Sequence, residues 1–517
     1  MLSKTIAGSS NIPFISARNR LLGWGALIAA IYAGFLFLFP LFPSIDQSKT
    51  VLDVEMMLKD GRKWFALFYI FGLLTTFFAY WRMMKIVHAF SKEEPEAANG
   101  LRFWVLGIGI VCALLLIGLY PITALDVVLY VVRARLWALY GGSPMLALPA
   151  HFPQDPFIRF AGEYKNQPSP YGPLWELIAQ IPIRLGITGI GSGTIAMKII
   201  SLISYVCTAV LLGWHSQQQS PRYEVSNLTA LTFFAVNPLV LLQTIGNGHN
   251  DMVMMAFMTL GLIWWQRGKW VETAFALTLA TLIKVTGFIL IPLFGMAVLA
   301  ASPNWRTRFT RGFIVAAIFI VTTLIAFRLT GPLPAALEGT KTALFGRLGY
   351  SPSYAMRILV NQFTRDLHTI QLPTNIGNYL FVLYYLYLLF QLATKKMTLL
   401  DAGFMAFFSQ LFLGSTFRIW YPLWLIPFAA LNLNSSTYWR TFLFGITAEL
   451  SILTYFLLWR WILGHWNWPK TTAFRPHWEY WFITTWITVP WAFGIPLLVP
   501  WLRRRKDSQR FDNTLWI

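Results

Sequence analysis

Long apolar runs recur along the whole chain, and they constrain its fold more than any other feature of the sequence. Clear examples are residues 22–42, 103–120, 313–327 and 481–501. Each is close to the roughly 20 residues that a helix needs to cross a bilayer. Only 12% of the 517 residues are charged, about half of the roughly 25% that is usual in soluble proteins. We therefore predict a polytopic membrane protein that forms a single membrane domain over residues 1–517.

The distribution of Lys and Arg predicts how the chain is oriented. Short basic segments at residues 18–20, 267–269, 302–311, 395–396 and 503–506 can all be cytoplasmic, as the positive-inside rule requires. This arrangement needs about fourteen crossings and places both termini in the cytoplasm. The expected crossings are approximately 22–43, 64–81, 103–121, 195–213, 226–244, 251–266, 270–285, 286–300, 312–329, 376–394, 398–413, 419–431, 440–460 and 480–501.

The net charge of +20 has two possible meanings. In a soluble protein such a charge would indicate nucleic acid. In a membrane protein, basic residues at cytoplasmic ends of spans meet anionic lipid headgroups. We therefore expect membrane lipids, and no nucleic acid, among the partners.

Two long segments, residues 121–193 and 331–375, fall on the external side in this topology. Residues 172–186 are apolar but carry Glu176 and Arg184, and we expect them to lie in the outer interface and not to cross. Long loops in a compact protein are usually functional or disordered. Because these two contain many aromatic residues, we expect them to be ordered.

Polar residues gather on the same external side, next to apolar runs. The motif NGHND contributes Asn247, His249, Asn250 and Asp251. Other polar residues there are Asp126, just after an early span, and Tyr171 in SPYGPLWE, Lys284 in TLIKVTG, and Arg418 and Tyr421 in GSTFRIWYPLW. An ionisable group at the bilayer centre is unfavourable by roughly 2.5–3.5 kcal/mol. Several such groups at one membrane level therefore predict a polar cavity that opens outward.

These residue types suit one kind of chemistry. Asp126 could take a proton from a hydroxyl that attacks an activated carbon. Four cations could hold a phosphate and stabilise its developing charge: Lys284, Arg418, Arg347 and Arg357. The amide, imidazole and carboxylate groups of NGHND could bind sugar hydroxyls, and aromatic side chains such as Tyr171 and Tyr421 could line the sugar site.

Structural explanations remain open for single residues. Asn250 and Asp251 could be N-caps of the following helix, and Asp126 could cap a helix as well. His249 could be a hydrogen-bonded structural histidine. Lys284 could extend to the interface and contact lipid headgroups. Asn237-Pro238 is expected to end or kink a helix.

In their order along the chain, these motifs resemble the GT-C superfamily of integral-membrane glycosyltransferases. Asp126 is followed by YGPLWE, NP, NGHND, a basic turn, LIK and FRIWYPLW. The set is similar to that of bacterial polyprenyl-phosphomannose-dependent α-1,6-mannosyltransferases, over roughly residues 101–431. On this basis residues 1–100 form a two-span N-terminal extension, 101–431 a catalytic core, and 432–517 the C-terminal spans.

The resemblance implies an all-α fold of about 14 transmembrane helices, with juxtamembrane helices in the first long external loop. It implies a polyprenyl-phosphate sugar donor, with mannose as the sugar, and a glycan or lipid-linked acceptor. It implies an inverting transfer on the extracytoplasmic face of the cell membrane, with Asp126 as general base, no cofactor and no metal. Many members of the superfamily carry two acids in the first external loop, whereas Asp126 stands alone here.

Two other functions fit the same sequence. One is a transporter or flippase of a lipid-linked or amphiphilic substrate, for which polar groups near the midplane and an internal repeat are typical. No repeat is visible in this sequence, and its polar residues lie at one boundary. The other is a GT-C transferase that uses a different lipid-phosphate sugar.

Overall fold

The computed structural model describes residues 14–47, 63–143, 145–215, 226–331, 351–364, 366–457 and 478–507. Within these ranges the chain is helical, and the pairing of Pro40 with Leu119 is an isolated bridge. The all-α expectation is confirmed for this part of the chain. The helices of the first half are α1 (Phe14–Leu38), α2 (Ser44–Gln47), α4 (Lys63–Glu93), α5 (Pro95–Ile117), α6 (Asp126–Tyr140), η1 (Pro149–His151), η2 (Ile158–Asn166), α7 (Pro173–Arg184), α8 (Ile190–Trp214), α9 (Asn227–Ala235), α10 (Pro238–Val240) and η3 (Leu241–Gly246).

The described part of the second half is also helical. Its helices are α11 (Asp251–Gln266), α12 (Trp270–Ile283), η4 (Val285–Ile289), α13 (Leu290–Ala301), α14 (Trp305–Thr330), α16 (Pro352–Phe363), α17 (Leu367–Ala393), α18 (Leu399–Leu413), η5 (Tyr421–Leu425), α19 (Ile426–Leu431), α20 (Ser435–Leu457) and α21 (Trp478–Asp507).

Fewer helices qualify as membrane spans than the sequence predicts. In the described residues, six are long and apolar enough to cross a bilayer: α1, α4, α5, α8, α14 and α17. A seventh is possible if α9 and the helical segment Pro238–Gly246 count as one span bent by 44°. The expected count of about fourteen is therefore not confirmed, because apolar helices such as α12, α13 and α18 are shorter than 18 residues.

The bend between α9 and α10 confirms the prediction for Asn237-Pro238. Proline lacks the backbone N–H that would continue the helix. The Asn237 side chain instead accepts a hydrogen bond from Leu239 N at 3.0 Å and begins the next helical segment. That segment continues as η3, a π-helix that leads directly to residue 247.

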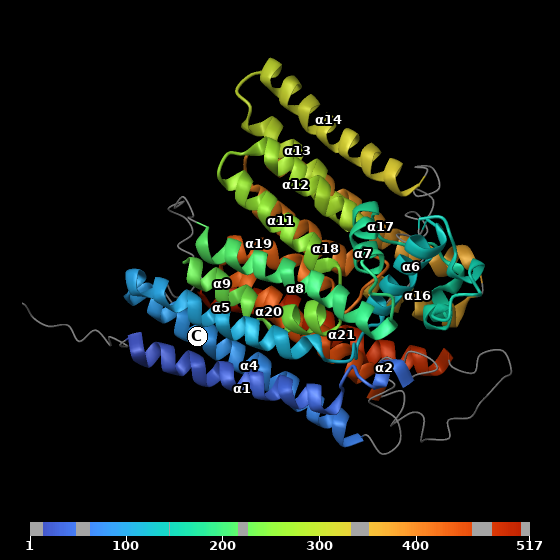
Figure 1. Ribbon diagram of the computed structural model, residues 1–517. Coiled ribbons are helices and arrows are strands. Elements are labelled where there is room, and N and C mark those ends of the chain that lie inside the picture. The colour runs from blue at the N-terminus through green and yellow to red at the C-terminus, as the bar shows by residue number, and fades with distance from the viewer. Residues whose placement is uncertain are drawn as a thin grey trace, which may run out of the picture.

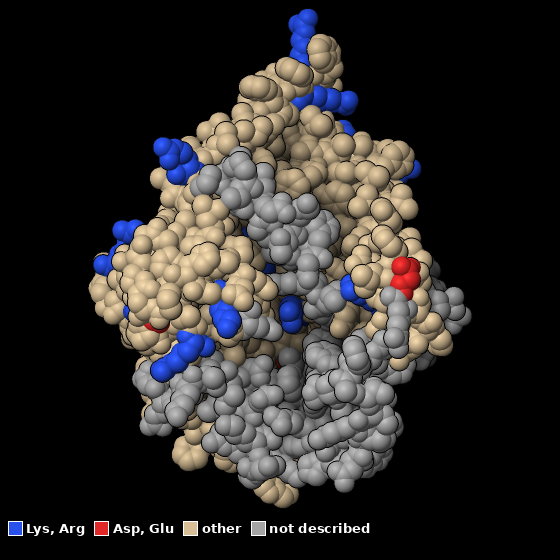
Figure 2. Space-filling model, turned by 90° about the vertical axis from the view of Figure 1, so that its right-hand side faces the viewer, with Lys and Arg blue, Asp and Glu red and all other residues tan. Residues whose placement is uncertain are grey.

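The main helices run side by side in a bundle, and α6, α7 and α16 lie at one end of it (Figure 1). Helices α6 and α7 belong to the first long segment predicted to be external, and they pack against each other. Helix α7 has 12 residues, too few to cross a bilayer, as expected for its segment. Viewed from this end, the molecule has a hollow near its middle with basic side chains around it (Figure 2).

Helices α11 and α12 form an antiparallel hairpin that determines where the candidate site lies. Asp251 is the first residue of α11, and Lys284 directly follows α12. Because the two helices run in opposite directions, both residues come to the same end of the hairpin. This end also meets α7, since Gly172 N donates to Ile283 O at 3.0 Å.

Candidate functional site

The loop of residues 247–251 lies directly against the start of α6. Gly248 has a φ of +71°, and a Cβ there would lie 2.7 Å from Val127 Cγ2. This position therefore requires glycine for both its backbone conformation and the close approach. The result is that NGHND and Asp126, about 120 residues apart in sequence, are neighbours in space.

Asp126 is held by the second motif, SPYGPLWE. Its Oδ1 accepts a hydrogen bond of 2.6 Å from the Tyr171 hydroxyl. Tyr171 reaches this position because Gly172 packs on the end of α12, where a Cβ would meet Leu282 O at 2.0 Å. The Asp126 side chain is 19% exposed, so it is partly accessible to a ligand.

Asp126 does not act as a helix cap. The residue that caps α6 is Leu125, and no side chain there makes a capping hydrogen bond. The same is true of α11, in which Asn250 occupies the cap position without a side-chain bond. Asn250 therefore stands at the cap position as one alternative expected, but its side chain makes no capping bond, and Asp126 and Asp251 are first helical residues and not caps.

His249 is buried beside Asp126. Its Nδ1 lies 4.0 Å from Asp126 Oδ2, longer than a hydrogen bond, and its ring stacks on Trp420 with centroids 3.9 Å apart. Nε2 has no hydrogen-bond partner within the part of the chain that the structure describes. A buried donor or acceptor without a partner is unfavourable, so this atom is available to a ligand.

Burial and neighbouring charges determine the protonation states here. Burial raises the pKa of the Asp126 carboxyl. Four groups act in the opposite direction and leave that pKa below its ordinary value: His249, Tyr171, Lys284 and Arg418. Burial lowers the pKa of His249 to about 4, although Asp126 and Asp251 oppose the shift. At neutral pH, Asp126 is therefore a carboxylate and His249 is uncharged.

Lys284 forms a buried ion pair with Asp251. Its Nζ lies 2.9 Å from both carboxylate oxygens, and Trp424 Nε1 donates to Asp251 Oδ1 at 2.6 Å. The Lys284 side chain is 14% exposed, whereas that of Asp251 is completely buried. Lys284 therefore does not extend to the interface as the structural alternative suggested.

Aromatic rings surround the lysine. Tyr421 stacks on Trp424 with centroids 4.0 Å apart. The Lys284 Nζ lies 5.4 Å from the Tyr421 ring centroid and 5.6 Å from that of Trp424, within the range of a cation–π interaction. Lys284 and Tyr421, predicted from separate motifs, are thus brought together.

Asn247 and Asn250 contact protein groups. Asn247 Nδ2 donates to Thr123 Oγ1 at 2.6 Å and to Gln243 Oε1 at 2.9 Å, and its Oδ1 accepts from Thr123 N at 3.3 Å. Asn250 Oδ1 accepts from the Tyr130 hydroxyl at 3.3 Å. The Asn247 amide thereby connects the NGHND loop to the segment that leads into Asp126.

The other predicted cations are Arg418, Arg357 and Arg347. Arg418 is half-buried and close enough to act on the Asp126 carboxylate. Arg357 is half-buried on α16, and no hydrogen bond or ion pair joins it to Asp126 or Asp251 among the described residues. Arg347 lies outside the described residues.

Sequence reasoning missed several members of this site. Trp420 and Trp424 occur in the quoted motif GSTFRIWYPLW, and their spacing of four residues, one helical turn, could have identified them. Glu449 is buried and accepts a hydrogen bond of 2.6 Å from Gln243 Nε2, the residue that also holds Asn247. A carboxylate inside the apolar run 440–460 was a signal for such a role. No group of three or more His, Cys, Asp or Glu that could hold a metal occurs within the described ranges.

Comparison with known proteins gives a consistent family. The family described as "Alpha-(1->6)-mannopyranosyltransferase, N-terminal domain" matches residues 24–300. Alpha-(1->6)-mannopyranosyltransferase B of Corynebacterium glutamicum is 27% identical over 237 residues, which cover 41% of this chain and 38% of the relative. Alpha-(1->6)-mannopyranosyltransferase A of the same organism is 24% identical over 172 residues, or 33% of this chain and 34% of the relative. That of Mycobacterium tuberculosis is 29% identical over 124 residues, or 24% and 23%. The matched regions thus span well under half the length of each relative.

Proposed function

Because the chain belongs to the α-(1→6)-mannopyranosyltransferase family, whose N-terminal domain matches more than half of it, we propose that it is a membrane mannosyltransferase. The donor is a polyprenyl-phosphate mannose, and the acceptor is a hydroxyl of a glycan or of a lipid-linked glycan. Transfer takes place at the extracytoplasmic face and inverts the configuration at the anomeric carbon.

One observation carries the proposal: residues from four separate motifs converge around Asp126. Its carboxylate is held by Tyr171, lies beside His249, and is influenced by Lys284 and Arg418. A fixed, ionised and partly accessible carboxylate next to cations suits a reaction that removes a proton at one point and releases a phosphate nearby.

In the proposed reaction, Asp126 takes the proton of the acceptor hydroxyl. The acceptor oxygen attacks the anomeric carbon from the face opposite the phosphate, and the bond between that carbon and the phosphate oxygen breaks. The donor is a phosphodiester with one negative charge, and polyprenyl monophosphate leaves with a second. A β-linked donor gives an α-linked product.

The cations receive the additional negative charge. Arg418 is the first candidate for the departing phosphate because a guanidinium can form two parallel hydrogen bonds with it. Lys284 is already paired with Asp251, so its positive charge acts on the phosphate at a distance. Its cation–π contacts also hold the rings of Tyr421 and Trp424 in place. His249 binds a sugar hydroxyl through its free Nε2, and Asn247 positions the loop. Arg347 and Arg357 remain proposals for the outer part of the donor site.

The proposal is tested by sugar transfer in nanodiscs. Purified wild-type protein receives radiolabelled polyprenyl-phosphate mannose, a short α-mannoside acceptor and EDTA. We expect transfer in the presence of EDTA, and a loss of about 10²–10⁴-fold in Asp126→Asn, the range typical of a general base. Asp366→Asn is the matched control, because this exposed carboxylate caps α17 and asparagine is an equally good cap.

Each outcome is informative. Equal transfer by Asp126→Asn and wild type would retain the enzyme class and remove Asp126 from its role. If the wild type neither transfers mannose nor binds or hydrolyses the donor, while the folded protein moves a lipid-linked sugar across liposome membranes, the transferase proposal is wrong.

A further inference from the structure

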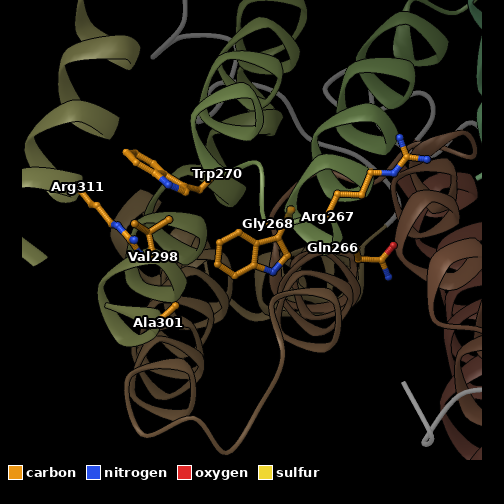
Figure 3. Close-up of a pocket in the computed structure, with 8 residues that line it drawn as sticks. Gln266, Arg267, Gly268, Trp270, Val298, Ala301 and Arg311 are labelled. Carbon is orange, nitrogen blue, oxygen red and sulfur yellow. The ribbon is translucent and has the colours of Figure 1, made fainter. Parts of the chain in front are cut away.

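A polar cleft of about 510 Å³ lies at the far end of the α11–α12 hairpin (Figure 3). Its lining residues include Trp265, Arg267, Gly268, Trp270, Val298 and Arg311. The candidate active site is at the other end of the same hairpin, where α11 begins. A helix of 16 residues is about 24 Å long, so the cleft is separate from that site.

The cleft forms where the turn between α11 and α12 meets the turn between α13 and α14. Gly268, between α11 and α12, has a φ of +74° and no atom near the position of a Cβ, so the turn depends on the left-handed conformation that glycine adopts readily. Arg267 and Lys269 flank it. The other wall is the first part of α14, from which the Arg311 guanidinium lies 5.5 Å from the Trp270 ring centroid.

Figure 3 shows how the polar side chains are divided. Trp270 and Arg311 lie on one side of the cleft, and Gln266 and Arg267 lie on the other. Arg267 Nη2 is 3.0 Å from His215 Nδ1, so its guanidinium is partly engaged. Besides its contact with the Trp270 ring, Arg311 makes, among the described residues, a single long hydrogen-bond contact of 3.5 Å with Ser302 Oγ, and it is the cation best placed to receive a ligand.

Positive charge at this end of the hairpins is not balanced. The two turns and the start of α14 carry five cations: Arg267, Lys269, Arg306, Arg308 and Arg311. Glu272 is the single acidic residue between positions 252 and 330. Within the described residues, none of the five cations lies within 4.0 Å of a carboxylate.

Tryptophans lie at the ends of the helices that form the cleft. Trp265 is the second-to-last residue of α11, Trp270 is the first residue of α12, and Trp305 is the first residue of α14. Tryptophan at helix ends is typical of the headgroup level of a bilayer. Arginines at the same level as such tryptophans lie where lipid phosphates are.

We propose that this cleft binds the phosphate of an anionic phospholipid. Arg311 donates to the phosphate, and Trp265 and Trp270 pack against the glycerol part of the lipid. An anionic lipid is favoured over a zwitterionic one, because a zwitterionic headgroup brings its own cation to a surface that already has excess positive charge. The proposal does not depend on the proposed mannosyltransferase activity.

The test uses native mass spectrometry of the full-length protein in detergent, titrated with phosphatidylglycerol or with phosphatidylcholine. We expect the wild type to bind phosphatidylglycerol preferentially. Arg311→Gln should bind it about fivefold more weakly, which corresponds to about 1 kcal/mol for a single basic residue near a membrane surface. Arg306→Gln is the matched control, because Arg306 is an exposed arginine on the same helix that does not line the cleft.

Three results would overturn the proposal. The first is equal loss of binding in both variants, which would mean that the charge acts diffusely. The second is a wild type without preference for the anionic lipid. The third is an undiminished preference in Arg311→Gln. If Arg311→Gln does not yield a folded protein, Arg311→Lys and Arg267→Gln test the same cleft: weakened binding in both supports the proposal, and unchanged binding in both refutes it.

Discussion

The ion pair between Asp251 and Lys284 makes a quantitative prediction about stability. Lys284→Met removes the cation and leaves the fully buried Asp251 carboxylate with Trp424 Nε1 as its recorded donor. Removing one partner of a buried pair costs about 3–5 kcal/mol. The reverse change is milder: in Asp251→Asn the amide oxygen can still accept from Trp424, and Lys284, at 14% exposure, can turn toward water. We expect about 1–2 kcal/mol for that change.

The double variant separates the interaction energy of the ion pair from the effect of removing each side chain. With both charges removed, no uncompensated ion remains, so Asp251→Asn/Lys284→Met should be more stable than Lys284→Met alone by about 2 kcal/mol or more. The measurement is the free energy of unfolding in mixed detergent–SDS micelles. Lys269→Met is the control, since this exposed lysine at the opposite end of the hairpin should change stability by no more than about 0.5 kcal/mol. Additive effects, or a Lys284→Met variant as stable as the control, would refute the reasoning.

Two further predictions concern protonation. Tyr171→Phe removes the hydrogen-bond donor that stabilises the Asp126 carboxylate, so the pKa of Asp126 should rise. In a pH–rate profile recorded toward acid, the transfer rate should then begin to fall at a higher pH than in wild type. The KM for the donor should be unchanged. His249→Gln should flatten the dependence of the free energy of unfolding on pH. The pKa of His249 is lowered from 6.5 to about 4, so the unfolded chain binds the proton more readily than the folded protein does. In the wild type, the stability that is complete above pH 6.5 is therefore lost as the pH falls toward 4. The difference between wild type and variant across this window should be roughly 2–4 kcal/mol in unfolding titrations, and equal slopes would contradict it.

The composition predicted the helical class, and three of the four clearest apolar runs coincide with candidate spans, whereas the run 481–501 coincides with a shorter apolar helix, Thr485–Pro500. The runs around residues 22–42, 103–120 and 313–327 lie in α1, α5 and α14, which are long and apolar enough to cross a bilayer. The number of membrane crossings was harder to predict. An apolar sequence indicates that a helix is shielded from water, but it does not show whether lipid or protein surrounds the helix. Helix α11 illustrates this point: it is as apolar as a span, yet most of its residues are buried inside the bundle.

The sequence predicted which motifs lie near one another in the candidate site, but not which side chains form pairs. Asp126 and NGHND were expected at one membrane level, and they are adjacent. The pairing of Lys284 with Asp251 depends on how α11 and α12 align, which their sequences do not specify. The position of Trp424, 173 residues beyond Asp251, depends on packing of the whole bundle. A lysine proposed as a phosphate ligand therefore has a carboxylate partner that spacing alone did not indicate.

The contact between Asp251 and Trp424 also bears on how this protein can be recombined with its relatives. The family match ends at residue 300, whereas Trp420, Tyr421, Trp424 and Glu449 all follow that point and complete the site from the other half of the chain. The candidate site is therefore built from both halves of the chain. A chimera joined near residue 300 keeps Asp126 and NGHND intact in sequence, but it places foreign side chains against His249, Asp251 and Gln243. Such a chimera should regain a native site only when those partners are exchanged together with it.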